Sequence, residues 1–210
     1  MLSSLYSFFK FIFYVFFRIF YRLEVIGQEN IPKEGGVIIA SNHVSYLDPP
    51  VLGVSINRKT TFMAREGLFK IPILNIFVKS FSFPVRRGKT QPSTIKEAVR
   101  RLNNGELIVI FPEGGRSPDG KLMEPKRGIG VIAGISRATI VPTFISGTEK
   151  ALPVGAKFLH PARIKVIFGK PIKVKEHPQD KETQEKICKN ITDAIKELKI
   201  ETTSKSKVKK

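Results

Sequence analysis

Short apolar runs alternate with amphipathic, helix-like stretches over most of this chain. Six runs have the length and the apolar or β-branched content of strands, and they cover residues 36–40, 60–64, 81–85, 107–111, 138–145 and 163–168. Helical patterns cover 51–58, 93–103, 128–137 and 180–199, while 66–79 fits either a helix or a hairpin. Strands that alternate with helices predict an α/β fold: a single domain with a mostly parallel central sheet flanked by helices.

The helix predicted at 93–103 has the clearest end signals. Thr94 and Glu97 have the spacing of a capping box, and Asn104-Gly105 provides a stop. Together, the patterns divide the chain into an amino-terminal helical segment at 1–23, a domain at 24–202 and a basic, disordered tail at 203–210.

The amino-terminal segment is dense in phenylalanine and also carries basic residues. On a helix of about 100° per residue, its serines, tyrosines and basic residues gather in an arc of about 120°, and its apolar residues fill the rest. The polar side holds Ser3, Ser4, Ser7, Lys10, Tyr14, Arg18, Tyr21 and Arg22, with Phe11 as the one apolar residue among them. A basic stripe opposite a phenylalanine face is typical of an amphipathic helix that lies in the headgroup region and anchors the protein to a membrane.

Two other structures fit the same segment. A spanning or re-entrant helix has about the right length, but Lys10 lies near its middle and the longest uncharged run, 11–17, is too short to span a bilayer. An aromatic helix packed into the core of the domain is the other alternative. A cleaved signal peptide fits poorly, because the leading residues lack charge and no cleavage site follows.

The 210 residues include 36 Lys and Arg against 18 Asp and Glu, a formal net charge of +18. Such a charge favours a polyanionic partner, either nucleic acid or an anionic lipid surface. No recognised nucleic-acid motif is present, and the phenylalanine-rich leader has no role in a nucleic-acid-binding protein, so we expect an anionic membrane surface and no nucleic acid. The single cysteine, Cys188, excludes an intramolecular disulfide and, with three histidines, argues against a zinc site.

A histidine and an aspartate follow the first predicted strand, in the segment Ser41-Asn42-His43-Val44-Ser45-Tyr46-Leu47-Asp48. A turn before Pro49 can fold the Asp48 carboxylate onto one ring nitrogen of His43, which leaves the other nitrogen free to take a proton from a hydroxyl. A His-x4-Asp spacing alone has little specificity, and a structural histidine is the alternative.

The strand at 107–111 runs into a glycine-rich loop, FPEGGRSP at 111–118. Gly114 and Gly115 allow a tight turn with exposed N–H groups, and Arg116 has a planar guanidinium suited to phosphate oxygens. The carboxyl end of a strand is where open α/β sheets bind ligands. A nucleotide phosphate loop is excluded, because Leu122 stands where the magnesium-binding Ser or Thr is required. A plain tight turn is the structural alternative.

Four short blocks, in this order, resemble the membrane-associated glycerolipid acyltransferases, specifically the 1-acylglycerol-3-phosphate (lysophosphatidate) acyltransferases. The resemblance runs from about Ile26 to about Pro171. The blocks are Asn42-His43-x4-Asp48, Phe83-Pro84-Val85-Arg86-Arg87, Phe111-Pro112-Glu113-Gly114-Gly115-Arg116-Ser117, and Val141-Pro142-Thr143-Phe144 followed by Gly147, with Lys126-Arg127-Gly128 after the third. One block is weak evidence, but four in order are highly specific.

The resemblance implies an enzyme of phospholipid synthesis that moves a fatty acyl group from a thioester to the sn-2 hydroxyl of 1-acylglycerol-3-phosphate, giving phosphatidic acid. It implies that His43 is the general base and that Asp48 orients its ring. The acceptor site is expected to hold Arg86, Arg87, Glu113, Gly114, Gly115, Arg116 and Lys126, with Glu113 orienting the arginines. We expect no cofactor and no metal, with acyl-coenzyme A or acyl-acyl carrier protein as co-substrate. We also expect the protein at the cytoplasmic face of the cell membrane.

Two positions depart from the family pattern or are ambiguous within it. Gly115 stands where the family usually has threonine, and the family arginine of the second block is Arg86 or Arg87, with the spacing favouring Arg87. Glycerol-3-phosphate or another lysophospholipid stays open as the acceptor. A thioesterase or other lipid hydrolase, in which His43 activates water, is the enzymatic alternative.

Overall fold

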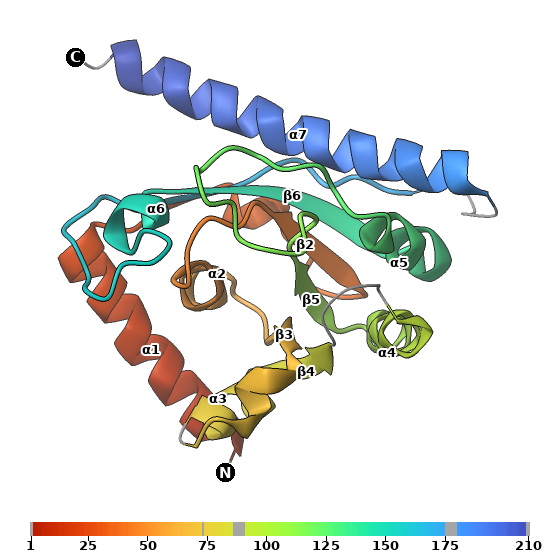
Figure 1. The fold of residues 1–210 in the computed structure, drawn as a ribbon, viewed down its shortest axis with the longest axis horizontal. Coiled ribbons are helices and arrows are strands. Elements are labelled where there is room, and N and C mark those ends of the chain that lie inside the picture. The colour runs from red at the N-terminus through yellow and green to blue at the C-terminus, as the bar shows by residue number, and fades with distance from the viewer. Residues whose placement is uncertain (1, 73, 86–90, 175–179, 209–210) are drawn as a thin grey trace.

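The computed structural model describes residues 2–72, 74–85, 91–174 and 180–208. Within these residues lies a seven-stranded sheet with the order β1-β7-β6-β2-β5-β3-β4 (Figure 1). The strands are β1 (Glu24–Ile26), β2 (Val37–Ser41), β3 (Thr60–Arg65), β4 (Ser82–Val85), β5 (Leu107–Ile110), β6 (Thr139–Ser146) and β7 (Lys165–Phe168). All the pairs formed by these strands are parallel except β6 with β7, so the predicted α/β domain with a mostly parallel sheet is confirmed.

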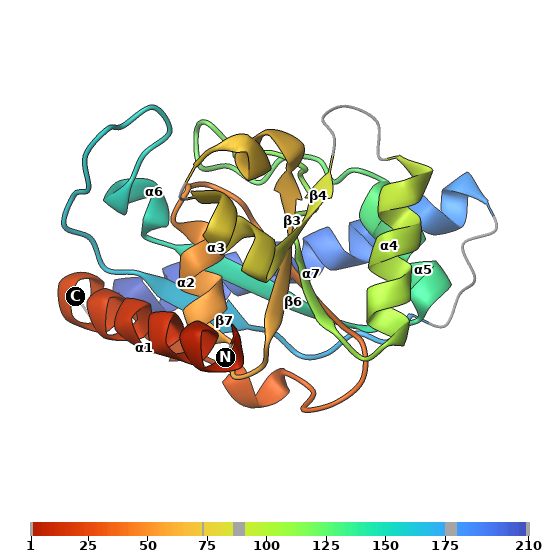
Figure 2. The ribbon, with the colours of Figure 1, turned by 90° about the horizontal axis from the view of Figure 1, so that it is seen from below.

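Helices cover both faces of the sheet (Figures 1 and 2). On one face lie α1 (Leu2–Tyr21) and α2 (Asp48–Ser55), and on the other lie α4 (Pro92–Asn103), α5 (Gly128–Ser136) and α7 (Lys181–Val208). The shorter elements are the 3-10 helices η1 (Gln28–Asn30) and η2 (Glu66–Lys70) and the helices α3 (Leu74–Phe81) and α6 (Thr148–Ala151).

The alternation of side chains along the central strands explains the two layers. In β2, Val37 and Ile39 pack in the cluster that includes α1 and α2, whereas Ile38 and Ala40 pack in the cluster that includes α4, α5 and α7. β5 divides its residues in the same way. A strand that is buried on both faces requires the continuous apolar sequence from which β2 and β5 were predicted.

The predicted elements differ from the observed ones mainly at their ends. Gln91 is the N-cap of α4 and no side chain caps this helix, so the predicted capping box is wrong; Glu97 instead binds Arg100 and Arg101. The predicted stop of α4 is confirmed by Gly105, whose backbone is left-handed.

Two other differences concern β1 and α7. β1 was not predicted, because three residues are too few to show a pattern. The predicted disorder from residue 203 is wrong as far as Val208, because α7 continues to that residue.

Helix α1 docks on the domain with part of its predicted polar side. Tyr21 is buried together with Phe17, and Lys10 donates a hydrogen bond to the carbonyl of Ile56, just after α2. Burial lowers the pKa of Lys10. The expectation that the basic stripe faces lipid headgroups is therefore wrong for Lys10. Phe17, Tyr21 and Leu23 belong to the core of the domain, so the boundary at residue 23 does not separate two folding units.

The rest of the α1 surface exposes several large apolar residues beside Tyr14 and Arg18. Its exposed large apolar residues are Phe8, Phe11, Ile12, Phe13, Ile19 and Phe20. In the part of the chain that the structure describes, no helix is both long enough and apolar enough to cross a membrane.

The turn from β6 into α6 provides a test of the fold. Gly147 has a left-handed backbone with φ of 90°, and a Cβ there would lie 1.9 Å from the carbonyl oxygen of Arg163. Gly155 has a similar φ of 88° but open space around it. We expect Gly147→Ala to lower the free energy of unfolding by about 3 kcal/mol or more. We expect Gly155→Ala to lower it by only about 1 kcal/mol. Urea unfolding measures both variants. An equal decrease in the free energy of unfolding for Gly147→Ala and Gly155→Ala would contradict this packing.

Candidate active site

Two loops meet at one edge of the sheet because β2 and β5 are adjacent and parallel. Strand β2 leads into residues 42–47 and β5 leads into residues 111–127, so both loops leave from the carboxyl edge of the sheet. The backbone N–H of Ser117 donates to the carbonyl of His43 at 2.8 Å, which joins the loops directly. The two segments that carry the predicted chemistry are therefore neighbours.

Asp48 is fully buried at the start of α2 and organises the first loop. Its Oδ2 lies 2.7 Å from Nδ1 of His43 and accepts the backbone N–H groups of Val44 and Ser45 at 2.7 and 2.8 Å. Its Oδ1 is buried without a partner among the described residues. A carboxylate only accepts hydrogen bonds, so Nδ1 of His43 carries the proton and Nε2 is the free base. The contact that the His-x4-Asp spacing permits is present.

The ring of His43 is also held by Phe111. The two rings are stacked, with centroids 4.0 Å apart and planes inclined by 16°. The His43 side chain is 16% exposed. The stack fixes the plane of the imidazole and the bond to Asp48 fixes its rotation within that plane. Sequence reasoning gave Phe111 no role, although its position at the end of a strand beside β2 is a signal that could have found it.

The Glu113 carboxylate binds two backbone N–H groups of the site. Its Oε1 accepts the N–H of His43 at 3.0 Å and its Oε2 accepts the N–H of Met123 at 3.1 Å. Both carboxylate oxygens bind backbone, and no hydrogen bond joins Glu113 to Arg116 among the described residues. The prediction that Glu113 orients the arginines is therefore not borne out for Arg116, and for Arg86 and Arg87 it stays a prediction. Burial raises the pKa of the Glu113 carboxyl, and the hydrogen bonds from His43 and Met123 oppose that rise.

Arg116 lies over the ring of Tyr46, with its guanidinium carbon 3.4 Å from the ring centroid. Its Nη1 is buried and lacks a hydrogen-bond partner among the described residues. A guanidinium held by a cation–π contact, with a donor still unused, is suited to bind an anion. Arg116 was predicted from its loop, whereas Tyr46 was not, because the four residues between His43 and Asp48 carry no recognisable pattern.

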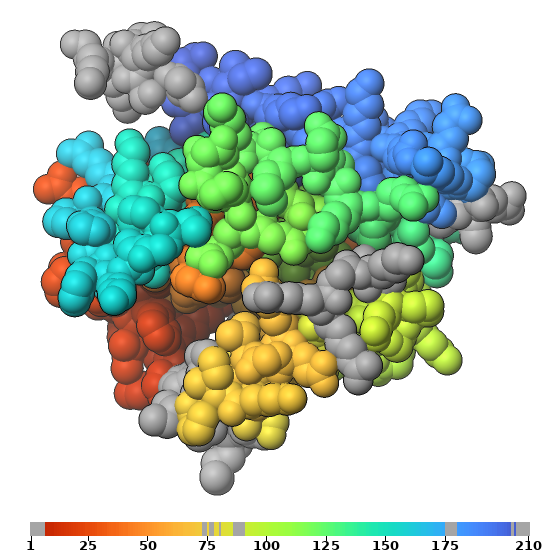
Figure 3. Space-filling view, in the orientation of Figure 1, coloured from red at the N-terminus to blue at the C-terminus, as the bar shows by residue number. Residues whose placement is uncertain are grey.

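The remaining predicted residues lie on the same loop or outside the described part of the chain. A Cβ on Gly114, whose φ is 67°, would come within 2.7 Å of Cδ of Lys126, so the lysine side chain lies over this glycine. Gly115 has open space around it. Figure 3 shows this loop (green) on the exposed face beside the His43 loop (orange). Arg86 and Arg87 lie outside the described residues, and their role stays a prediction.

Asn42 ties the His43 loop to the strand on its other side. The side-chain amide donates to the carbonyl of Ile145 at 2.9 Å and accepts the N–H of the same residue at 2.8 Å. Both groups are buried. Asn42 therefore holds the base of the loop against β6, a role that its position in the first block did not reveal.

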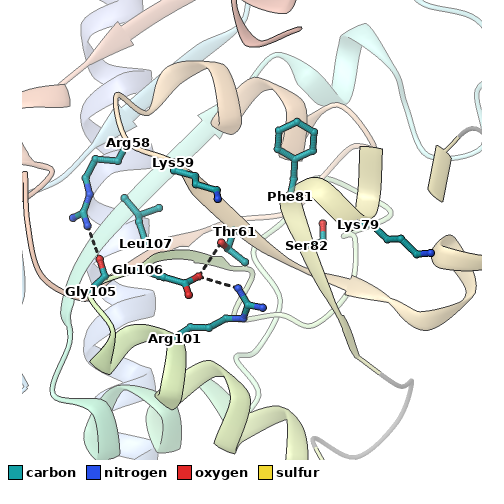
Figure 4. A pocket seen from close by; sticks show the side chains of 10 residues that line it. All are labelled: Arg58, Lys59, Thr61, Lys79, Phe81, Ser82, Arg101, Gly105, Glu106 and Leu107. Carbon is teal, nitrogen blue, oxygen red and sulfur yellow. Dashed lines mark hydrogen bonds and ion pairs between the residues drawn. The ribbon is translucent and has the colours of Figure 1, made fainter. Parts of the chain in front are cut away.

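A separate pocket of about 550 Å³ opens at the opposite edge of the sheet (Figure 4). It is lined by Arg58, Lys59, Thr61, Lys79, Phe81, Ser82, Arg101, Gly105, Glu106 and Leu107. Arg58 donates to the Gly105 carbonyl, and Glu106 accepts from Arg101 and Thr61, so these groups join β3, α4 and β5. The described residues contain no cluster of three His, Cys, Asp or Glu side chains placed to hold a metal ion.

The pKa of Glu113 predicts how stability depends on pH. Because this pKa is raised above 4.5, the folded protein binds the proton more tightly than the unfolded chain does. The contribution of Glu113 to the free energy of unfolding therefore falls as the pH rises from 4.5 through the raised pKa. Glu113→Gln removes this titration, so its stability should fall less over that interval than the stability of the unmodified protein.

Urea unfolding at steps from pH 4.5 to about pH 7 measures the two slopes. The exposed Glu124→Gln is the matched control. Parallel curves for the unmodified protein and Glu113→Gln would contradict the burial of an ionisable Glu113.

Three comparisons with known proteins agree with this geometry. The Acyltransferase family model matches residues 22–146, which include both loops of the site. The chain is 31% identical over 180 residues to the 1-acyl-sn-glycerol-3-phosphate acyltransferase of Bacillus subtilis (strain 168), covering 84% of this chain and 87% of that protein. It is 32% identical over 158 residues to the chloroplastic 1-acyl-sn-glycerol-3-phosphate acyltransferase LPAT1 of Arabidopsis thaliana, covering 73% of this chain and 44% of the plant protein.

The fold also matches a solved structure, the crystal structure of the 1-acyl-sn-glycerophosphate (LPA) acyltransferase PlsC from Thermotoga maritima. The TM-score is 0.75 at 30% sequence identity, covering 94% of this chain and 79% of the other. The family model spans more than half of the chain, and the Bacillus protein is matched over most of its length. The chain belongs to the acyltransferase family.

Proposed function

We propose that this chain transfers a fatty acyl group from a thioester to the sn-2 hydroxyl of 1-acylglycerol-3-phosphate, giving phosphatidic acid. The observation that carries the proposal is the 2.7 Å contact between His43 and Asp48, in a loop that also holds Arg116 over Tyr46. A base and a cation so placed suit an acceptor that has a hydroxyl and a phosphate. The names of the Bacillus and Thermotoga relatives support the same acceptor.

In the proposed reaction, Nε2 of His43 takes the proton of the acceptor hydroxyl while the hydroxyl oxygen attacks the thioester carbonyl. The new C–O bond forms, the C–S bond breaks, and the proton passes from the imidazolium to the leaving thiolate. Asp48 stabilises that imidazolium through Nδ1. The products are an ester and a thiol, so the chemistry balances without a covalent acyl-enzyme.

Cys188 does not compete with His43 for a catalytic role. Its sulfur is buried beside α5 and lies 3.7 Å from the carbonyl oxygen of Lys126. Burial raises the pKa of this thiol, whereas a nucleophilic cysteine requires a lowered one.

Arg116, Gly114, Gly115 and Lys126 form the proposed site for the acceptor phosphate, with Arg86 and Arg87 completing it. The unused Nη1 donor of Arg116 supplies a charge-assisted hydrogen bond, and the exposed Lys126 adds a second positive charge. Gly115 leaves space at the loop surface, so an anion can approach the backbone there.

The enzyme acts, in this proposal, at the cytoplasmic face of the cell membrane, with the exposed apolar side of α1 in the lipid surface. The acceptor is itself a lipid, so the active site must meet the bilayer. The net charge of +18 favours an anionic surface. It also suits an acidic donor, either acyl-coenzyme A or acyl-acyl carrier protein.

The base is tested by His43→Ala, with the exposed His160→Ala as the matched control. We expect His43→Ala to fold and to lose about 10²–10⁴-fold in transfer rate, because a positioned base contributes that much. Phosphatidic acid formation, together with acyl release without acceptor, measures transfer and hydrolysis separately. Retention of more than a tenth of the transfer activity would exclude His43 as the base.

The phosphate site is tested through the KM for lysophosphatidate. Arg116→Ala should raise it about 10- to 100-fold by removing a charged hydrogen bond. Tyr46→Ala should raise it about 3- to 30-fold by removing the cation–π contact, while Tyr46→Phe keeps the ring and most of the affinity. The exposed Lys121→Ala is the control. If neither Arg116→Ala nor Tyr46→Ala changed the KM for lysophosphatidate, the acceptor phosphate would have to bind elsewhere.

The contact of α1 with the membrane is tested by flotation with anionic vesicles. The triple variant Phe8→Ser, Phe11→Ser, Ile19→Ser alters exposed positions only, so it should remain folded and lose vesicle binding. Ile200→Ser, an equally exposed apolar position on α7, is the control. A triple variant that floats like the unmodified protein would show that α1 is not the anchor.

A further inference from the structure

The loop between α6 and β7, residues 152–162, exposes apolar side chains that nothing in the proposed reaction uses. Phe158 is 77% exposed, the largest fraction among the large apolar side chains that the structure describes, and Leu159 is 50% exposed. Together with Val154 they make this loop an apolar projection. Adjacent exposed apolar residues at a loop tip mark a contact surface more often than isolated ones do.

Backbone hydrogen bonds close the loop at its base. The N–H of His160 donates to the carbonyl of Ala151 at 2.8 Å, which brings the two ends of the loop together. Within it, Ala156 N–H donates to the carbonyl of Pro153 at 3.0 Å. Phe158 and Leu159 are thus presented on a closed loop, and little conformational entropy is lost when they bind.

The loop lies between α1 and the active site. At one end, Oγ of Ser45 donates to the carbonyl of Leu152 at 2.9 Å, and the N–H of this serine is one of the donors to Asp48. At the other end, the N–H of Ile164 donates to the carbonyl of Tyr21, the last residue of α1. Figure 3 shows the loop (cyan) beside α1 (red). Whatever the loop binds lies close to the catalytic loop.

The charge around the loop indicates what it binds. From Lys150 to Lys165 there is no acidic residue, and Lys157 and Arg163 are exposed on either side of Phe158 and Leu159. Apolar tips flanked by cations suit an anionic lipid surface. A stable protein partner would need about 800 Å² on this side, which two large side chains do not provide.

We infer that the 152–162 loop is a second membrane-contacting element, which inserts Phe158 and Leu159 between the headgroups of an anionic bilayer beside α1. The inference rests on the proposed function, since a lipid acceptor brings the bilayer to the site. The loop and α1 then hold the His43 loop at the lipid surface from two sides.

The chain contains no tryptophan, so Phe158→Trp introduces a single tryptophan, which can be excited selectively over the four tyrosines. The probe is vesicles of phosphatidylcholine with about a quarter phosphatidylglycerol, prepared with and without brominated acyl chains. We expect the emission of Phe158→Trp to shift to shorter wavelength on these vesicles and to be quenched by the brominated lipid. Ile200→Trp, on α7, should show neither change.

The double variant Phe158→Ser, Leu159→Ser should reduce vesicle binding by about tenfold, against Ile200→Ser as control. Its rate with detergent-dispersed lysophosphatidate should stay unchanged. The inference would be overturned if Phe158→Trp bound the vesicles but the brominated lipid did not quench its tryptophan emission. It would also be overturned if the unmodified protein did not bind the vesicles. If the emission of Phe158→Trp shifted with rising protein concentration in the absence of vesicles, the loop would instead contact a second copy of the chain, and the inference would be wrong. Binding and quenching use no substrate, so they are read independently of acyl transfer.

Discussion

One oxygen atom, Oδ2 of Asp48, determines the conformation of the active site. A buried carboxylate is costly unless its charge is met by donors, and here the donors are the His43 ring and the N–H groups of Val44 and Ser45. Asp48 also opens α2, where the helix dipole favours a negative charge. The same hydrogen bonds that pay for this burial fold the loop and aim the imidazole, so folding and catalysis depend on one set of contacts.

The parallel sheet supplies the second requirement, which is to bring distant segments to that loop. β2 lies between β5 and β6, and each neighbour contributes a contact from its own side. From the β5 side, Glu113 and Ser117 bind the backbone of His43; from the β6 side, Asn42 pairs with Ile145. Although the reactive groups lie on loops, buried hydrogen bonds to both flanking strands hold them rigidly.

The sequence predicts the parts of this structure that depend on side-chain pattern. Continuous apolar runs located β2 and β5, but only the structure shows that the two strands are neighbours, so that their loops meet. Contacts to the backbone leave no such pattern in the sequence. Glu113 binds two N–H groups, which any residues at those positions supply, so this part of its role was not predicted. The helical pattern of α1 did not show which side meets the protein. The docked side combines Phe17 from the predicted apolar face with Lys10 and Tyr21 from the predicted polar face, because the carbonyl of Ile56 accepts a hydrogen bond from Lys10.

The central claim is that Asp48 fixes His43 with the proton on Nδ1 and with Nε2 free to accept one. Nitrogen-15 NMR of the protein labelled at histidine, with His43 assigned by comparison with His43→Ala, reads the tautomer directly. For the neutral imidazole we predict a protonated Nδ1 and an unprotonated Nε2, and a loss of this preference in Asp48→Ala. A proton on Nε2 in the unmodified protein would contradict the account, because His43 would then have no free nitrogen with which to activate the acceptor.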